Sequence, residues 1–174
     1  MKKVMMTMMM LAVTVSLAAS CGQRQQSVAS IEQMTVEEGK TAPDFELPDL
    51  QGKPTKLSSL KGKYVVVDFW GAWCIWCVRG IPNMKEAYAK YKDKMEILGV
   101  DCRDTEEKWK AAVKEHELPW KQVRCPDDKF RNLMEQYSIE GFPTKVIVDP
   151  KGKIVKVVVG EDPSFYTFLD SLFE

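Results

Sequence analysis

The sequence has no excess of charge of either sign, almost no histidine, and no apolar stretch long enough to span a membrane as a helix. Among its 174 residues, 25 are basic and 25 are acidic, and His116 is the only histidine. Balanced charge argues against nucleic-acid binding, which requires a basic face or stripe. We therefore expect no nucleic-acid partner, and neither a metal nor another cofactor. The longest apolar stretch, residues 4–19, falls short of the roughly 20 residues that cross a bilayer.

This apolar stretch is better explained as part of an export signal. Two lysines precede it and small residues follow it, immediately before Cys21, which is the order of regions in a secretory signal peptide. Residues 17–21, LAASC, resemble a bacterial lipobox, although Ala18 stands where leucine is commonest. We therefore predict a lipoprotein signal peptide at residues 1–20 and a lipid anchor on Cys21 that holds the protein on a periplasm-facing membrane surface. The alternative is a secreted protein in which Cys21 is unmodified.

The segment after the signal is polar and the rest of the chain is rich in apolar runs. Residues 21–40 are nearly free of aromatic side chains, which predicts a flexible tether. Residues 41–174 suffice for one domain with a sizeable core, which we expect to be a monomer. Because disulfides persist outside the cytosol, cysteine pairs in this domain are considered first as disulfides and only then as metal sites.

Strand and helix patterns alternate along this domain. They predict a small hairpin with a helical turn (44–63), a buried strand (64–70), a helix containing Pro82 (75–92), a strand (95–101), a helix (104–118), a strand (120–125), a helix (127–139), an antiparallel hairpin (144–160) and a final helix (163–173). Strands that alternate with helices form sheets covered by helices. The fold class is therefore α/β, with helices on both faces of the sheet.

Cys74 and Cys77 stand in the segment WGAWCIWC, where the first long strand gives way to a helix. Cys74 is then at the helix N-terminus, where unpaired backbone N–H groups and the helix dipole favour an anion and lower the pKa of a thiol. Cys77, one turn later, should lie deeper and within reach of the first sulfur. Such a pair can attack a substrate disulfide, form a mixed disulfide and resolve it. A purely structural disulfide is the alternative.

Asp68 interrupts the apolar strand that leads to these cysteines. Its position, two residues before Trp70, predicts that its carboxyl points into the core beneath the cysteine pair. Burial is costly for a charged carboxylate, so its pKa should rise, which suits a group that exchanges a proton with the inner thiol. The alternatives are that Asp68 caps a loop or pairs with a lysine.

Several motifs together resemble the thioredoxin family: VVVDFWGAWCIWC, the helix proline Pro82, and GFPT at residues 141–144. The segment before the first long strand and the extra helix and strand at about 104–125 resemble the TlpA/ResA-type branch. The resemblance implies a thioredoxin fold: a central mixed sheet with helices on both faces, an N-terminal β-hairpin and an inserted helix and strand. It also implies a thiol–disulfide oxidoreductase that acts on protein disulfides, with apocytochrome c among the known substrates of such relatives, and that receives electrons from a membrane donor.

The resemblance also assigns roles to the residues of the motif. Cys74 matches the exposed nucleophile, Cys77 the resolving cysteine and Asp68 the buried acid of thioredoxins. Many TlpA/ResA-type proteins have a neutral residue at the position of the acid and a glutamate three residues after the second cysteine. That position is Gly80 here, so the proton chemistry is expected to be thioredoxin-like.

The residues around the cysteines are candidates for contact with substrate. By resemblance, Pro143 matches a cis-proline that leaves the backbone of Phe142 free to pair with an extended substrate, whereas an ordinary trans proline is the alternative. Trp73 is either a contact surface or purely structural. Ile75 and Trp76 replace the Gly-Pro dipeptide of thioredoxins and should alter the redox potential. The direction of electron flow stays open, and the buried acid favours a reductant.

Cys102 and Cys125 fall at the C-terminal ends of two predicted parallel strands, at the same edge of the sheet as Cys74. They form a second disulfide if those strands are neighbours, or they are two small buried residues.

Two other functions compete with disulfide exchange. A peroxiredoxin-like peroxidase would carry a threonine three residues before the attacking cysteine, where this chain has Gly71. A copper chaperone on the same fold would add a distal histidine to the soft thiolates. The sole candidate, His116, lies on a charged helix and is expected to be solvated.

Overall fold

The computed structural model describes residues 36–174. The predicted signal peptide, Cys21 and the first part of the predicted tether lie outside the described residues. The elements are β1 (Glu46–Pro48), β2 (Pro54–Lys56), the 3-10 turn η1 (Leu57–Leu60), β3 (Tyr64–Trp70), α1 (Ile75–Tyr91), β4 (Met95–Cys102), α2 (Glu106–Glu115), β5 (Lys121–Cys125), α3 (Asp127–Gln136), β6 (Thr144–Val148), β7 (Ile154–Val159) and α4 (Pro163–Phe173).

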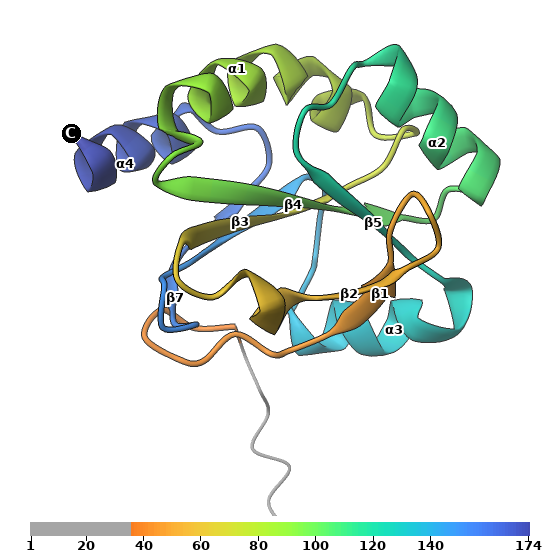
Figure 1. The fold of residues 1–174 in the computed structure, drawn as a ribbon, viewed down its shortest axis with the longest axis horizontal. Helices are drawn as coiled ribbons and strands as arrows, with labels where there is room; N and C mark the ends of the chain where they lie inside the picture. Colours follow the sequence, from red (N-terminus) through yellow and green to blue (C-terminus); the bar gives the residue numbers. More distant parts are fainter. Residues whose placement is uncertain (1–35) are drawn as a thin grey trace, which may run out of the picture. The chain divides into compact units, whose positions relative to one another are not determined.

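The central sheet has five strands in the order β5-β4-β3-β6-β7. Strands β3, β4 and β5 are parallel, whereas β6 is antiparallel to both β3 and β7. Helices α1, α2 and α4 cover one face of this sheet, and α3 with the β1–β2 hairpin covers the other (Figure 1). The predicted thioredoxin fold is confirmed, including the N-terminal hairpin and the inserted α2 and β5.

Strand β3 shows how the sequence builds both layers of the core. Its run of valines and aromatic residues favours a buried strand, and successive side chains point to opposite faces. Val67 and Phe69 belong to the apolar cluster beneath α3, whereas Val66 belongs to the cluster beneath α1 and α4. By the same alternation Asp68 lies on the α1 face, as its position in the strand predicted.

The residues just before Thr41 form backbone hydrogen bonds with the folded domain. The backbone N–H of Gly39 donates to Ile154 at 2.7 Å, and the carbonyl of Lys40 accepts from the N–H of Ile154 at 2.8 Å. Val36 packs against the core beneath α3. The last residues of the segment predicted as a tether are therefore held against the domain.

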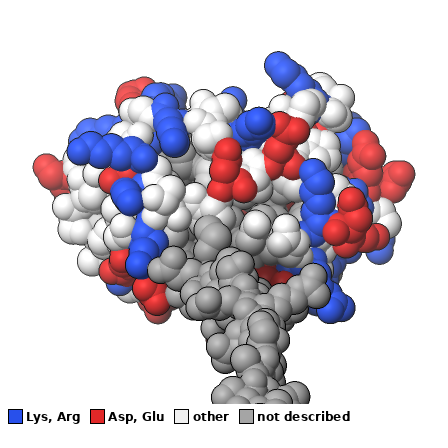
Figure 2. All heavy atoms as spheres, turned by 90° about the horizontal axis from the view of Figure 1, so that it is seen from below, with Lys and Arg blue, Asp and Glu red and all other residues white. Residues whose placement is uncertain are grey.

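No helix within residues 36–174 combines the length and the apolar character that crossing a membrane requires. Basic and acidic side chains are interspersed over the face seen in Figure 2. That face therefore carries no basic stripe of the kind that binds nucleic acid.

Candidate active site

Cys74 and Cys77 are joined by a disulfide at the start of α1, with their Cα atoms 5.2 Å apart. Cys74 is the N-cap residue of the helix, and its Sγ accepts the backbone N–H of Cys77 at 3.1 Å. An N-cap acceptor satisfies one of the free N–H groups of the first turn. The first sulfur therefore occupies the position at which the helix dipole stabilises a thiolate.

The expectation that Cys74 is exposed and Cys77 deeper is wrong for this disulfide form. Cys74 is 5% exposed and Cys77 is 7% exposed. Both sulfurs belong to an apolar cluster with Trp70 and Trp109, against which Phe142 packs. In this oxidised form the two cysteines are therefore shielded from solvent by the apolar side chains around them.

Asp68 lies beneath the cysteines, as predicted, and is 8% exposed. Burial raises the pKa of its carboxyl to about 6, while the charge of Lys145 lowers this pKa and the charge of Glu161 raises it. Within the described residues its Oδ1 has no hydrogen-bond partner. With a pKa near 6, the carboxyl can both accept and return a proton at neutral pH.

Lys145 and Glu161 form a buried ion pair beside Asp68, which the sequence did not predict. Lys145 lies opposite Asp68 in the β3·β6 register, and its side chain is 2% exposed. Its Nζ is 2.8 Å from Oε2 of Glu161, and the Tyr166 hydroxyl donates to Oε1 at 2.6 Å. The sequence signal for this pair is the lysine in TKVIV, because a charge in an apolar strand requires a partner.

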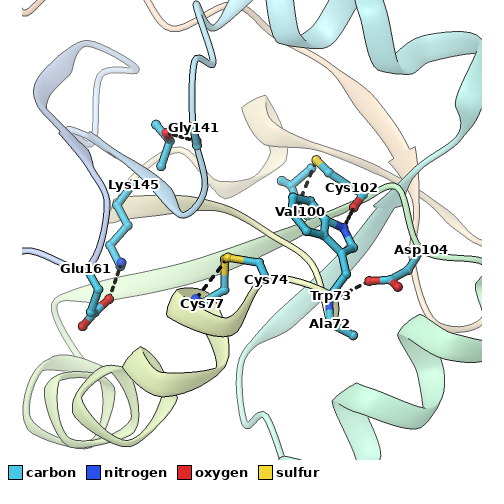
Figure 3. The surroundings of a disulfide bond; sticks show 11 residues. Ala72, Trp73, Cys74, Cys77, Val100, Cys102, Asp104, Gly141, Lys145 and Glu161 are labelled. Carbon is cyan, nitrogen blue, oxygen red and sulfur yellow. Dashed lines mark hydrogen bonds and ion pairs between the residues drawn. A yellow bond between two sulfur atoms is a disulfide. The ribbon is translucent and has the colours of Figure 1, made fainter.

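Gly80 makes room for this ion pair. A Cβ at Gly80 would lie 2.3 Å from Oε2 of Glu161. This chain lacks the glutamate that many TlpA/ResA-type proteins carry three residues after the second cysteine, but the carboxylate of Glu161, from the loop before α4, approaches the same part of the helix. The lysine and glutamate lie to one side of the disulfide in Figure 3.

On the other side of the disulfide, the loop that leads to Cys74 is fixed by two side-chain contacts (Figure 3). The indole N–H of Trp73 donates to the carbonyl of Cys102 at 2.8 Å, and the N–H of Ala72 donates to Oδ2 of Asp104 at 2.6 Å. These contacts tie the loop to the carboxyl end of β4. Trp73 therefore has a structural role, and the sequence left this role open.

Trp73 also contributes to an apolar surface beside the cysteines. Its side chain is 48% exposed, and those of Ile75 and Trp76 are 59% and 57% exposed. Phe142 lies edge-on to Trp73 with a centroid distance of 5.2 Å, and the guanidinium of Arg79 lies 5.0 Å from the Trp76 ring. The predicted substrate-contact residues thus lie around the disulfide.

The Phe142–Pro143 peptide bond is cis, as predicted. Pro143 lines the same small cavity as Asp68 and Cys77.

Cys102 and Cys125 are free thiols in the structure, so the second disulfide considered from the sequence is not present. The two residues do lie opposite each other on neighbouring strands. Each sulfur instead points to a backbone carbonyl, of Val100 and Pro126 respectively, at 3.6 Å. Burial raises the pKa of both thiols, that of Cys125 to about 12. They are two buried small residues.

Residues 36–174 contain no group of three or more histidine, cysteine, aspartate or glutamate side chains that could hold a metal ion. His116 is the C-cap residue of α2 and lies remote in sequence from the cysteine pair.

Comparison with known proteins agrees with this geometry. Residues 39–157 match the model of the AhpC/TSA family. The chain belongs to the AhpC/TSA family. Among its relatives is the thiol-disulfide oxidoreductase ResA of Bacillus cereus, 40% identical over 124 residues, which cover 71% of this chain and 70% of the relative. ResA of Bacillus subtilis is 35% identical over 127 residues, covering 72% and 69%.

Solved structures of this AhpC/TSA-family fold give the same result. The thioredoxin domain of a Bacteroides vulgatus thiol-disulfide oxidoreductase matches with a TM-score of 0.74 and 37% identity, covering 79% of this chain and 99% of that domain. A thiol:disulfide interchange protein from a Bacteroides species matches with a TM-score of 0.71 and 38% identity, covering 78% and 90%. The protein is accordingly a thiol–disulfide oxidoreductase of the ResA type, and its substrates are protein disulfides.

Proposed function

We propose that this oxidoreductase works as a reductant of disulfides in exported proteins. The observation that carries this direction is the position of Asp68, whose carboxyl shares an enclosed space with Cys77. Because the pKa of this carboxyl is about 6, it is largely ionised at neutral pH and can accept the proton of the Cys77 thiol. A dithiol that attacks a substrate requires such an acceptor.

The reaction transfers two electrons from the dithiol to the substrate. The Cys74 thiolate attacks one sulfur of the substrate disulfide, and the second substrate sulfur leaves as a thiolate and takes a proton from water. Cys77 then gives its proton to Asp68, and its thiolate attacks Sγ of Cys74. The mixed disulfide breaks, the remaining substrate sulfur leaves and is protonated, and the Cys74–Cys77 disulfide seen in the structure is the product.

The test measures reduction of an insulin-type protein disulfide by the reduced protein. Cys74→Ser should abolish turnover, because no nucleophile remains. Cys77→Ser should stop after the first step and leave substrate covalently joined to Cys74, which mass spectrometry after non-reducing electrophoresis would detect. Full turnover by the Cys74→Ser variant would sink the proposal. The redox potential of the wild-type cysteine pair can be measured by equilibration with glutathione. A potential high enough to make the pair an oxidant would reverse the proposed direction.

The apolar surface suggests which substrates are reduced. Trp73, Ile75 and Trp76 are half exposed around the disulfide, and Arg79 stacks on Trp76. Such a surface favours extended or unfolded segments with apolar residues next to a cysteine pair. Apocytochrome c before haem attachment is one substrate of this class. Replacing Trp76 by Ser should weaken the capture of such a peptide by the Cys77→Ser variant.

We also propose a setting for the reaction. The lipobox-like LAASC segment supports a lipid anchor on Cys21 that holds a periplasm-facing domain at the membrane. In this proposal the domain is a monomer and a membrane protein is its electron donor. Radiolabelled palmitate in cells that express the full chain, compared with cells that express Cys21→Ser, tests the anchor. Equal labelling of the two proteins would contradict it.

A peroxidase is disfavoured by the packing at Gly71. A Cβ there would lie 2.4 Å from Nε1 of Trp73 and 2.9 Å from the carbonyl of Cys102. The threonine that a peroxiredoxin places at this position would therefore collide with the hydrogen bond that holds the loop. Rapid consumption of hydrogen peroxide by the reduced protein would revive this alternative.

A further inference from the structure

The buried ion pair beside Asp68 requires an explanation other than stability. The Lys145 side chain is 2% exposed and that of Glu161 is 14% exposed. Transfer of two charges out of water has a large desolvation cost, and apolar residues of similar volume often stabilise a core equally well. A buried pair in contact with the chemistry of a site is therefore more informative about reaction than about folding.

The pair shares an enclosed space with the reacting groups. A cavity of about 10 Å³ is lined by Asp68, Cys77 and Pro143 together with Lys145 and Glu161. This volume is about that of a single water-sized probe. Asp68 and Lys145 are direct cross-strand neighbours, and such neighbours place their Cβ atoms about 4.5–5.5 Å apart. The two charges of the pair therefore act on the Asp68 carboxyl at short range.

The carboxylate of Glu161 is held by three features. Lys145 pairs with Oε2 at 2.8 Å, the Tyr166 hydroxyl donates to Oε1 at 2.6 Å, and Gly80 leaves the space that Oε2 occupies. The residues come from β6, from the loop before α4, from α4 and from α1. A carboxylate held by three other segments has a defined distance to its neighbours, which a freely rotating surface glutamate lacks.

We propose that Lys145 and Glu161 are positioning residues for disulfide exchange, whose opposite charges control when Asp68 takes the proton of Cys77 and when it returns it. This inference rests on the proposed function. Neither residue touches the sulfur atoms as a nucleophile or acid; both act through Asp68. The negative charge of Glu161 offsets part of the effect of the Lys145 charge on Asp68. The Asp68 carboxyl can therefore still be protonated near neutral pH and does not form a permanent ion pair with the lysine.

Other titratable groups that face Asp68 set the background of this control. Cys77 faces it from α1 and Tyr166 from α4, in addition to Lys145 and Glu161, whereas Cys102 on β4 belongs to the core on the opposite face of the sheet. Burial raises the pKa of Tyr166 and of Cys102, so both are neutral at physiological pH. Within the described residues, the charges that remain beside Asp68 are those of the lysine and the glutamate.

Two substitutions should move the pH profile in opposite directions. In Glu161→Gln the lysine is left to pair with Asp68, so Asp68 ionises at lower pH. In Lys145→Met the glutamate is left, so Asp68 ionises at higher pH. An opposite or like charge at this range shifts a carboxyl pKa by about one unit or more. The rate of the resolving step rises as Asp68 ionises. The midpoint of its pH profile should therefore shift by about one pH unit, downward in Glu161→Gln and upward in Lys145→Met.

The double variant and a glycine substitution refine the test. With both charges removed, the profile should lie between those of the single variants. Gly80→Ala displaces the Glu161 carboxylate without removing its charge, and alanine is a better helix former than glycine. Its profile should move in the same direction as that of Glu161→Gln. This variant also keeps the proposal testable if Lys145→Met fails to fold.

The readout combines stopped-flow kinetics with a direct titration. The resolving step is followed between pH 4 and pH 9, and the carboxyl carbon of Asp68 is titrated by NMR, with its signal assigned from Asp68→Asn. The matched controls are Lys110→Met and Glu106→Gln, which break an exposed ion pair on α2 and should leave both profiles unchanged.

Opposite shifts in the NMR titration and in the rate profile would establish the inference. Unchanged profiles, or shifts in the same direction for both variants, would overturn it. A purely structural role predicts shifts in the same direction, because either substitution would let water into the site to the same extent. The NMR titration separates this outcome from failure of the proposed function. If the wild-type protein reduced no protein disulfide at any pH, the Asp68 titration would still report whether the pair acts on it.

Discussion

At the scale of single residues, Asp101 is a second buried carboxyl near the site, at the carboxyl end of β4. It is 0% exposed. Burial, with the neighbouring Asp104 carboxylate, raises its pKa to about 8, whereas the charge of Arg124 lowers this pKa. Asp101 is therefore a neutral acid in the folded protein at pH 7, although the same group is ionised in the unfolded chain.

This difference predicts how stability depends on pH. Between about pH 4 and pH 8 the folded state keeps a proton on Asp101 that the unfolded state has lost, so the free energy of unfolding falls as the pH rises through this window. Asp101→Asn cannot ionise. The stability of the variant relative to the wild type should therefore increase between pH 5 and pH 8 and level off above pH 8, in urea unfolding at each pH.

Asp68 contributes a fall of the same sign up to about pH 6, but it is present in both proteins and cancels in the comparison. A difference in stability that stays constant from pH 5 to pH 9 would contradict the assignment of Asp101 as a neutral acid.

At the scale of elements, the connection from β3 to α1 decides where the first cysteine lies. The chain leaves β3 at Trp70 and reaches the N-cap Cys74 through Gly71, Ala72 and Trp73, and this short loop is tied to Cys102 and Asp104. We predict that Gly71→Ala breaks the Trp73–Cys102 hydrogen bond, because its Cβ would lie 2.4 Å from the indole nitrogen. Overpacking of this kind costs about 1–3 kcal/mol of stability.

The same variant should slow disulfide exchange, because the loop no longer fixes the helix start. Unfolding in urea and insulin reduction measure the two effects. Gly141→Ala is the matched control, since its Cβ would meet Val159 at an ordinary distance of 3.5 Å. Equal losses in the two glycine variants would show that the hydrogen bond of the loop is not responsible.

At the scale of the whole molecule, residues 38–40 are attached to the edge strand β7. Two backbone hydrogen bonds join residues 39 and 40 to Ile154, and Glu38 lies 3.5 Å from Lys156. A chain that begins at residue 41 should therefore be less stable than one that begins at residue 36, by about 1–3 kcal/mol at about 1 kcal/mol for each net hydrogen bond. Chemical unfolding of the two chains measures this difference.

Glu38→Gln in the longer chain is the control, because an exposed ion pair contributes about 0–1 kcal/mol. If the shorter chain were as stable as the longer one, the contacts with Ile154 would contribute nothing to the free energy of unfolding. The domain boundary predicted at residue 41 would then be correct for stability.

Local patterns predicted the elements and the reacting groups. The run of valines predicted β3, and the change from a strand pattern to a helix pattern predicted that Cys74 lies at a helix start. The position of Asp68, two residues before Trp70 in the strand, predicted that it points toward α1. Each of these predictions depends only on the period of one element. The sequence placed Cys102 and Cys125 at the same edge of the sheet, but that their strands are neighbours and that the sulfurs nevertheless do not bond was decided only by the structure.

What only the tertiary structure decided are the contacts that join distant segments. Lys145 and Glu161 are 16 residues apart and meet on different elements, and Glu161 fills a space that exists because residue 80, on a third element, has no side chain. The burial of Cys74 likewise depends on Trp70, Trp109 and Phe142, from separate elements. The sequence by itself determined which groups can exchange electrons and protons, since residue type and local period are written in it. The surrounding charges and the access to the sulfur were decided by packing, because burial and electrostatic coupling depend on distances between segments that no local pattern encodes.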